Sequence, residues 1–164
     1  MLMLVARAGA QGQAPNQKRT AYRAPVEFDI TYQLPGEKLR TAVANDLSAG
    51  GLRLVCAEDL MNDSRLELSF TLPSDFLEMF KSEREVEEMS PFGKRKRKVA
   101  ELPPAFGPMR VGGKVLRPFF SSLRRRFQYG IAFVDAPEHV TEELQRFIHF
   151  WQLYQLRKRN QVAD

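Results

Sequence analysis

The sequence predicts a mainly β fold of the α+β class, in which six antiparallel strands curl into a small barrel that is followed by one C-terminal amphipathic helix. Several short segments alternate apolar and polar residues and stop at Pro or Gly, which is typical of half-buried strands. Residues 137–159 instead repeat apolar side chains every three or four positions, as an amphipathic helix does. Residues 74–108 fit neither pattern, and we interpret them as a helical and basic insertion between two strands.

The first four predicted strands lie before Pro73. They are residues 26–32, 39–47, 52–55 and 65–72. Pro35 and Gly36 indicate a turn after the first strand. Residues 48–51 read Ser-Ala-Gly-Gly, and we expect this turn to need the positive φ that glycine adopts without strain.

The insertion is expected to begin with a helix-like stretch from Ser74 to about Met89, with Ser74 or Asp75 as its N-cap. Residues 94–98 read Lys-Arg-Lys-Arg-Lys and are interpreted as a partly mobile loop. Charge is unevenly distributed here, because residues 58–90 hold ten acids and three bases whereas residues 91–130 hold eleven bases and one acid. This asymmetry indicates a bipolar surface, or an acidic segment that folds against a basic one.

Two further strands, residues 109–116 and 127–134, complete the predicted barrel. The helix that follows has Pro137 near its first position, where the missing N–H costs nothing. Its apolar side chains share one face that we expect to pack on the barrel: Val140, Leu144, Phe147, Ile148, Trp151 and Tyr154.

The length and composition of the chain predict one domain at residues 18–160, preceded by a flexible N-terminal arm at residues 1–17. No apolar run approaches the roughly 20 residues that span a bilayer, and the single Cys56 allows no disulfide within the chain. We therefore expect a cytoplasmic protein. His139 and His149 have no metal-ligand spacing around them, and no catalytic or phosphate-loop motif occurs, so neither an enzyme nor a cofactor or metal site is expected.

Two short motifs carry the functional prediction: Arg19-x-x-x-Arg23, and Asp46-x-Ser48-x-x-Gly51. Guanidinium groups offer planar donor forks that suit phosphates and the O6/N7 edge of guanine. A carboxylate can accept from guanine N–H groups, while a hydroxyl and backbone N–H groups suit phosphate oxygens. Together the motifs predict a site for an anionic guanine nucleotide.

The order and spacing of these motifs resemble the signature of the PilZ family, bacterial receptors for cyclic di-GMP. The resemblance covers roughly residues 18–155 and implies a PilZ-type barrel with its C-terminal helix. It also implies cyclic di-GMP as the ligand and a downstream protein partner whose identity the sequence does not give. The insertion at 74–108 is longer than expected for the family.

The resemblance implies a role for each motif residue. Arg19 and Arg23 would hold guanine edges and phosphates, and Lys18 would add attraction for phosphate. Asp46 would accept from a guanine amine or hold an arginine in place, and Ser48 would bind a phosphate oxygen. The two glycines would let the backbone approach the ligand. The full expected ligand-binding set is Lys18, Arg19, Arg23, Asp46, Ser48, Gly50 and Gly51.

Two alternatives remain open from the sequence. One is a PilZ-like scaffold that binds a protein independently of ligand, through the insertion or through a second apolar face of the helix at Phe150, Leu153 and Leu156. The other is a barrel that binds nucleic acid through the basic residues between 91 and 126, Arg117 and Arg124–Arg126 among them.

Overall fold

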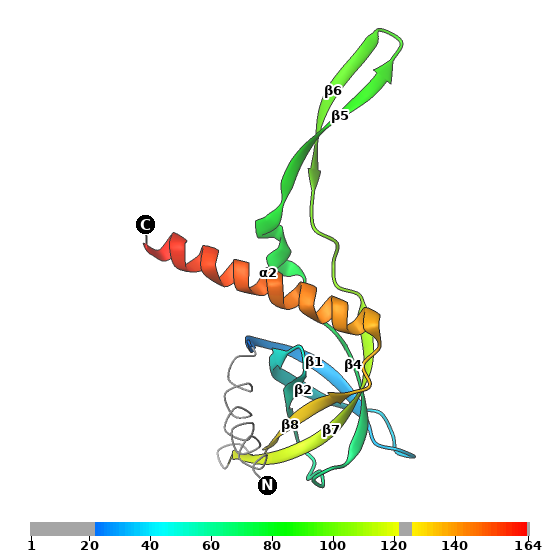
Figure 1. Cartoon of the computed structure of the whole chain (residues 1–164), viewed down its shortest axis with the longest axis vertical. Coiled ribbons are helices and arrows are strands. Elements are labelled where there is room, and N and C mark those ends of the chain that lie inside the picture. The colour runs from blue at the N-terminus through cyan, green and yellow to red at the C-terminus, as the bar shows by residue number, and fades with distance from the viewer. Residues whose placement is uncertain (1–21, 122–125, 164) are drawn as a thin grey trace, which may run out of the picture.

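A computed structural model describes residues 22–121 and 126–163 of the chain. Six strands form a closed antiparallel barrel in the order β1-β2-β3-β8-β7-β4, and β5 and β6 form a separate two-stranded sheet (Figure 1). In chain order the elements are β1 (Ala24–Gln33), β2 (Arg40–Ser48), β3 (Gly51–Cys56), β4 (Arg65–Thr71), the 3-10 helix η1 (Asp75–Phe80), β5 (Ser82–Ser90), β6 (Gly93–Glu101), β7 (Pro108–Ser121), β8 (Arg126–Val134) and α2 (Glu138–Ala163). The predicted fold class is therefore confirmed.

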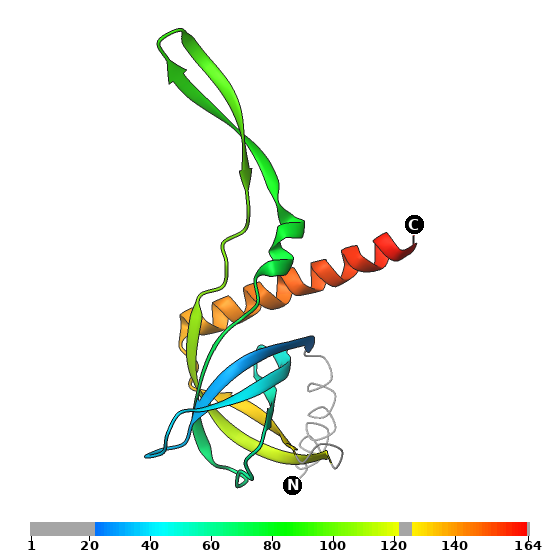
Figure 2. The same cartoon turned by 180° about the vertical axis from the view of Figure 1, so that it is seen from behind.

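The barrel core follows from the alternation of each strand. In β1 every second residue from Ala24 to Tyr32 is buried, and the residues between them are exposed or half-buried. Helix α2 crosses one side of the barrel, and the hairpin of β5 and β6 projects away beyond it (Figures 1 and 2). Val140, Leu144 and Phe147 of α2 are fully buried, so the predicted apolar face of this helix packs as expected. No helix among the described residues is long and apolar enough to cross a membrane.

The predicted helix from Ser74 to about Met89 is wrong beyond Phe80. Only η1 is helical; the acidic residues that follow form β5, and the basic run expected in a mobile loop forms β6. The reason is non-local, because the two strands pair along their whole length from Ser82↔Glu101 to Ser90↔Gly93 and bring acids opposite bases. The expectation that an acidic segment folds against a basic one is confirmed.

The apolar residues of η1 join the insertion to α2. The Phe76 ring lies 5.5 Å from the Phe147 ring and 5.1 Å from the Trp151 ring, both edge-on. The Phe80 ring lies 5.1 Å from that of Phe150, so part of the second apolar face of α2 is covered by the insertion. Leu156, on the same face, stays exposed. The base of the projecting hairpin is thus fixed to the helix by aromatic packing.

A buried tyrosine ties β1 to the loop after β3. The Tyr32 hydroxyl donates to the Glu58 carboxylate, which also forms an ion pair with Arg40 at 3.0 Å. Burial, more than this hydrogen bond to Glu58, raises the pKa of Tyr32 above its ordinary value. Cys56 lies nearby in the core, and burial likewise raises the pKa of its thiol.

Replacing Tyr32→Phe should lower the free energy of unfolding at neutral pH by about 1–3 kcal/mol, because a hydrogen bond to a charged group is lost. An unfolded tyrosine ionises near pH 10, whereas folded Tyr32 keeps its proton, so this residue makes stability fall as pH rises above about 10. Urea denaturation at neutral and alkaline pH should show a shallower alkaline decline for the variant. An equal decline in both proteins would contradict this assignment.

Candidate functional site

A groove of about 640 Å³ lies where β1 begins, beside the bend between β2 and β3. We call it the motif groove. Residues from the start of β1, the β2–β3 segment, the loop before β4 and the facing parts of β7 and β8 line it: Arg23, Asp46, Ser48, Gly50, Gly51, Leu52, Arg53, Asn62, Asp63, Leu116, Gly130, Ile131 and Ala132. The structure therefore brings Arg23 and four predicted residues of the second motif together. Lys18 and Arg19 lie outside the described residues.

Strand register explains why Arg23 reaches this groove. Ala24, the first residue of β1, pairs with Leu47 in β2. Because the strands are antiparallel, the residue before Ala24 enters the barrel beside Ser48. Arg23 is exposed there. Two segments more than twenty residues apart in sequence thus meet at one end of a strand pair.

Asp46 lies in an irregularity of β2. The register of β2 against β3 shifts between Asn45 and Ser48, and Asp46 has a left-handed φ of 51°. Aspartate is among the few residues that tolerate this region. The turned backbone directs the carboxylate to Arg53 of β3, with an Nη1–Oδ2 distance of 3.1 Å. Both side chains are about one-third exposed, so this ion pair orients the arginine more than it stabilises the fold.

The bend itself is held by Ser48. Its Oγ accepts from the N–H of Gly50 at 3.3 Å and donates to the carbonyl oxygen of Gly51 at 3.2 Å. The expectation that this turn needs the positive φ of glycine is wrong: among the described glycines, positive φ values fall at Gly36 and Gly93.

Gly51 is required for a different reason. A Cβ added there would lie 2.1 Å from the backbone carbonyl oxygen of Ile131 in β8. At Gly50 a Cβ would meet no atom within 4 Å. The second glycine of the motif therefore permits close contact of β3 with β8, and only the first borders open space.

Several lining residues were not predicted as site residues from the sequence. Arg53 supplies a second described guanidinium in the groove, and its pairing with Asp46 depends on the bulge, which no sequence signal indicates. Leu116 is 43% exposed and adds an apolar surface suited to one face of a planar base. On the other side, Asp63 forms an ion pair with Lys114 at 3.4 Å. The groove thus combines cations, a hydroxyl and an apolar wall.

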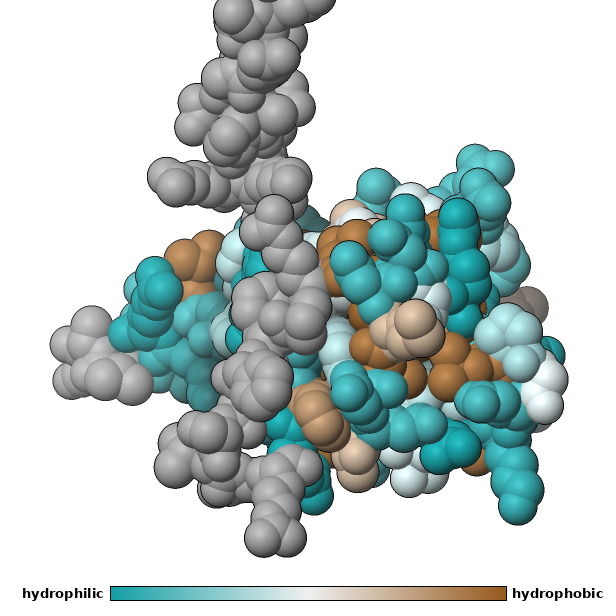
Figure 3. Space-filling model, turned by 90° about the horizontal axis from the view of Figure 1, so that it is seen from below, coloured by the Kyte–Doolittle hydropathy of each residue, from teal (hydrophilic) through white to brown (hydrophobic). Residues whose placement is uncertain are grey.

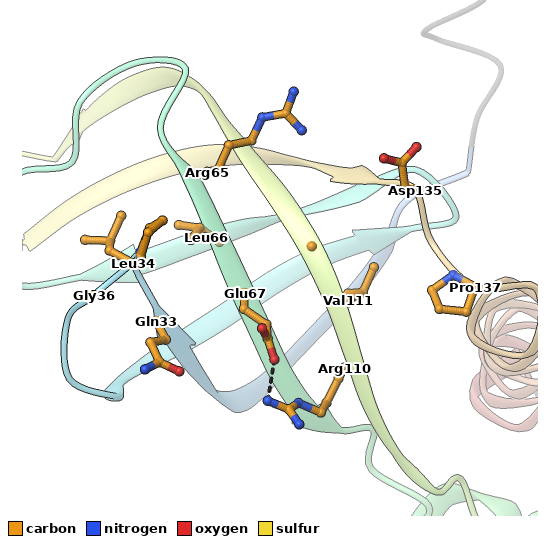
Figure 4. A pocket seen from close by; sticks show the side chains of 12 residues that line it. Gln33, Leu34, Gly36, Arg65, Leu66, Glu67, Arg110, Val111, Asp135 and Pro137 are labelled. Carbon is orange, nitrogen blue, oxygen red and sulfur yellow. Dashed lines mark ion pairs between the residues drawn. The ribbon is translucent and has the colours of Figure 1, made fainter.

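A second groove, of about 760 Å³, lies at the hairpin between β1 and β2 (Figure 4). Arg65, Arg110 and Asp135 line it, and Arg110 is paired with Glu67. It contains none of the predicted motif residues.

Figure 3 shows the barrel from the side away from α2, where hydrophobic residues are surrounded by hydrophilic ones. Within residues 22–121 and 126–163, no cluster of His, Cys, Asp and Glu could hold a metal ion.

Residues 17–83 match the family model of the PilZ domain. This part of the chain is similar to the PilZ domain. The match includes both motifs and the first four barrel strands, so the resemblance of the sequence is confirmed. None of the curated proteins matched the chain in a sequence comparison.

Solved structures share the PilZ fold at low sequence identity. The inhibitor of motility MotI/DgrA of Bacillus subtilis has a TM-score of 0.55 and 17% identity, covering 86% of this chain and 53% of that one. YcgR of Escherichia coli, in complex with c-di-GMP, has a TM-score of 0.52 and 16% identity, covering 88% and 50%. The MrkH–c-di-GMP complex of K. pneumonia has a TM-score of 0.51 and 11% identity, covering 84% and 54%. This chain spans about half the length of each.

The two glycines of the bend give a matched test of the local geometry. Gly51→Ala should lower the free energy of unfolding by about 1–3 kcal/mol or more, because its Cβ would collide with the Ile131 carbonyl. Gly50→Ala should change it by less than about 0.5 kcal/mol, because the space around it is open. Urea denaturation measures both, and similar losses at the two positions would contradict the described bend.

Proposed function

We propose that this chain is a cytoplasmic receptor that binds cyclic di-GMP in the motif groove and passes the signal to a protein partner by a change of conformation. In this proposal Arg23 and Arg53, joined by Lys18 and Arg19, hold the guanine edges and phosphates. Asp46 keeps Arg53 in position, and Ser48 together with the open backbone at Gly50 contacts a phosphate oxygen.

The observation that carries the proposal is the meeting of Arg23 with the Asp46–Gly51 bend in a single groove. The PilZ match over residues 17–83 supports it, because the match includes both motifs. Support also comes from YcgR and MrkH, which share this fold and were solved in complex with c-di-GMP. The position of Asp46 is consistent with the proposal, because a carboxylate already paired with Arg53 does not repel a phosphate as a free one would.

A route for the signal is supported by the surroundings of Tyr22. This residue precedes Arg23, and burial raises the pKa of its phenol while the nearby charge of Arg159 lowers it. Tyr22 is therefore close to the C-terminal half of α2. In the same half, Arg157 donates to the carbonyl oxygen of Met79 at the base of the insertion. A ligand that draws Arg23 into the motif groove would thus change the surroundings of Tyr22, α2 and the insertion.

A nucleic-acid interface is less well supported. The basic run lies in β6, and acids of β5 lie opposite it, as in the pairs Glu85↔Lys98 and Glu87↔Lys96. Close acids cancel much of the field that would attract a phosphate backbone.

Isothermal titration calorimetry tests binding directly. We expect heat of binding when cyclic di-GMP is added to the full chain. Arg23→Ala should weaken the affinity at least about ten-fold, because a charge-assisted hydrogen bond to the ligand is worth more than about 1.4 kcal/mol. Ser48→Ala should weaken it less, because its hydroxyl also maintains the bend.

Arg65→Ala is the matched control. Arg65 is an exposed arginine of the barrel that lines the second groove, so its loss should leave the affinity unchanged. Absence of heat with wild-type protein would reject the proposed ligand. Equal losses for Arg23→Ala and Arg65→Ala would mean that the ligand binds through general charge and not in the motif groove.

The signal route has a separate readout in Trp151, the single tryptophan of the chain. Its ring packs on Phe76 and lies 5.4 Å from Tyr154 of α2. Cyclic di-GMP should change its fluorescence in wild-type protein but not in Arg23→Ala at the same ligand concentration. If calorimetry shows binding while emission stays constant, the receptor remains and the route through α2 is wrong.

A further inference from the structure

The hairpin of β5 and β6, residues 82–101, is not packed against the rest of the described chain along most of its length, and we call it the arm. It extends from the barrel past α2 into solvent (Figures 1 and 2). Apart from half-buried Val86, Ser90 and Val99, all residues of the two strands are exposed. A lone two-stranded hairpin is only marginally stable in water unless something packs against it. The arm therefore needs a partner surface.

The arm is held in a defined direction at its base by two arginines of α2. Arg146 Nη1 donates to the carbonyl oxygen of Pro104 at 2.9 Å, on the chain that leaves the arm. Arg157 Nη1 donates to the carbonyl oxygen of Met79 at 2.9 Å, in the segment that leads into the arm. The Arg157 guanidinium also lies 4.5 Å from the centre of the Phe80 ring. Such anchoring on both sides is suited to presenting a rigid surface.

The strand register divides the side chains of the arm between two faces, because alternate residues point to opposite sides. On the first face four of the five charges have partners within the chain, and Arg95 is the one for which the described residues show no ion pair. Arg97 pairs with Glu88 at 3.2 Å, and Arg84 lies 3.8 Å from Glu101. This face also carries the half-buried Val86.

We call the opposite side the charged face; it consists of Glu83, Glu85, Glu87 and Met89 from β5 and Lys94, Lys96, Lys98 and Ala100 from β6. Three carboxylates line one edge and three ammonium groups line the other. Among the described residues none of these six charges forms an ion pair. Met89, at the end near the tip, is 84% exposed, and Phe92 in the turn is 100% exposed.

The balance of charge selects the partner. A surface with as many carboxylates as lysines has little net attraction for nucleic acid or an anionic membrane. It fits a surface with one acidic and one basic edge in the reverse order. The chain itself supplies such a surface, because a two-fold rotation about an axis parallel to the strands places β5 of one copy over β6 of the other.

We propose that the charged face is a self-association surface at which the arms of two copies of this chain pack side by side, with their tips pointing the same way. Stacked strands lie about 10 Å apart, a gap that glutamate and lysine side chains span together. Glu85 and Glu87 then face Lys98 and Lys96 of the second copy, because these residues are at the same level in the register. The two Met89 side chains also lie at one level, so the exposed apolar end is covered.

The size of the arm predicts a weak contact. Strands of nine residues are about 30 Å long, so the charged face is smaller than the ~800 Å² per partner of a standard interface. Sedimentation equilibrium of the full chain between about 1 μM and about 1 mM should therefore show a monomer–dimer equilibrium. Dimers should form at about 0.01 M salt and dissociate at about 1 M, where screening is nearly complete.

Charge reversal separates contacts between chains from contacts within one arm. Glu85→Lys/Glu87→Lys and Lys96→Glu/Lys98→Glu each place like charges across the interface and should weaken dimerisation at least about ten-fold. An equimolar mixture of the two variants should dimerise again. The fourfold variant that combines all these changes keeps opposite charges within each arm. It should form its own dimers but no mixed dimers with wild-type protein.

Three results would overturn the proposal: wild-type protein that stays monomeric across this range at low salt, dimers that both charge reversals leave intact, or mixed dimers of wild type and the fourfold variant as stable as the pure ones. Vesicles of phosphatidylcholine with phosphatidylserine test the competing surface. Retention of monomeric wild-type protein that is lost in Phe92→Ser would assign the arm to a membrane instead.

Discussion

The close contact between β3 and β8 at Gly51 is the constraint on which the rest of the structure depends. Only a residue without a Cβ fits against the Ile131 carbonyl, so the start of β3 can lie this near to β8. That contact closes the barrel beside the bend, and the N–H of Phe133 completes it by donating to the carbonyl of Gly50 at 2.9 Å. The Ser48 hydroxyl then spans the bend from within, and the groove forms around it.

The closure of the barrel at Gly51 also sets the positions of Arg23, of α2 and of the insertion. The start of β1 pairs beside the bend, so Arg23 enters the same groove. Strand β8 continues from the groove into α2, the helix that anchors the insertion through Arg146 and Arg157. The motif groove, helix α2 and the arm are thus linked in series by short connections. This arrangement is suited to a receptor whose signal appears at a distance from the ligand.

Local patterns were sufficient to predict the barrel and the helix. Alternation in residues 26–32 and 127–134 and the spacing from Val140 to Trp151 report burial directly, because each side chain either faces the core or does not. The motif residues could also be named from the sequence, because the chemistry of their side chains and their spacing are visible there. That Arg23 lies beside Ser48 required only the order of two antiparallel strands.

The charges indicated that an acidic segment folds against a basic one, but the strand conformation of these segments was not predicted. Phe76, Leu77 and Phe80 have helical spacing, and the Glu- and Lys-rich residues that follow have good helix propensity. The pairing of acidic β5 with basic β6 overrides this preference, and it becomes visible only when both strands are considered together. The left-handed Asp46 and its pairing with Arg53 depend on a bulge that no residue pattern indicates. The role of Gly51 was likewise assigned to the ligand and not to β8.

The central claim is that cyclic di-GMP binds where the start of β1 meets the β2–β3 bend. Amide chemical shifts of isotope-labelled protein, recorded during titration with cyclic di-GMP, test it most directly. Binding in the motif groove should give the largest changes at Arg23, at residues 46–53 and at residues 130–132, with little change around Arg65 and Arg110. Shifts concentrated in the second groove, or spread along β6, would contradict it.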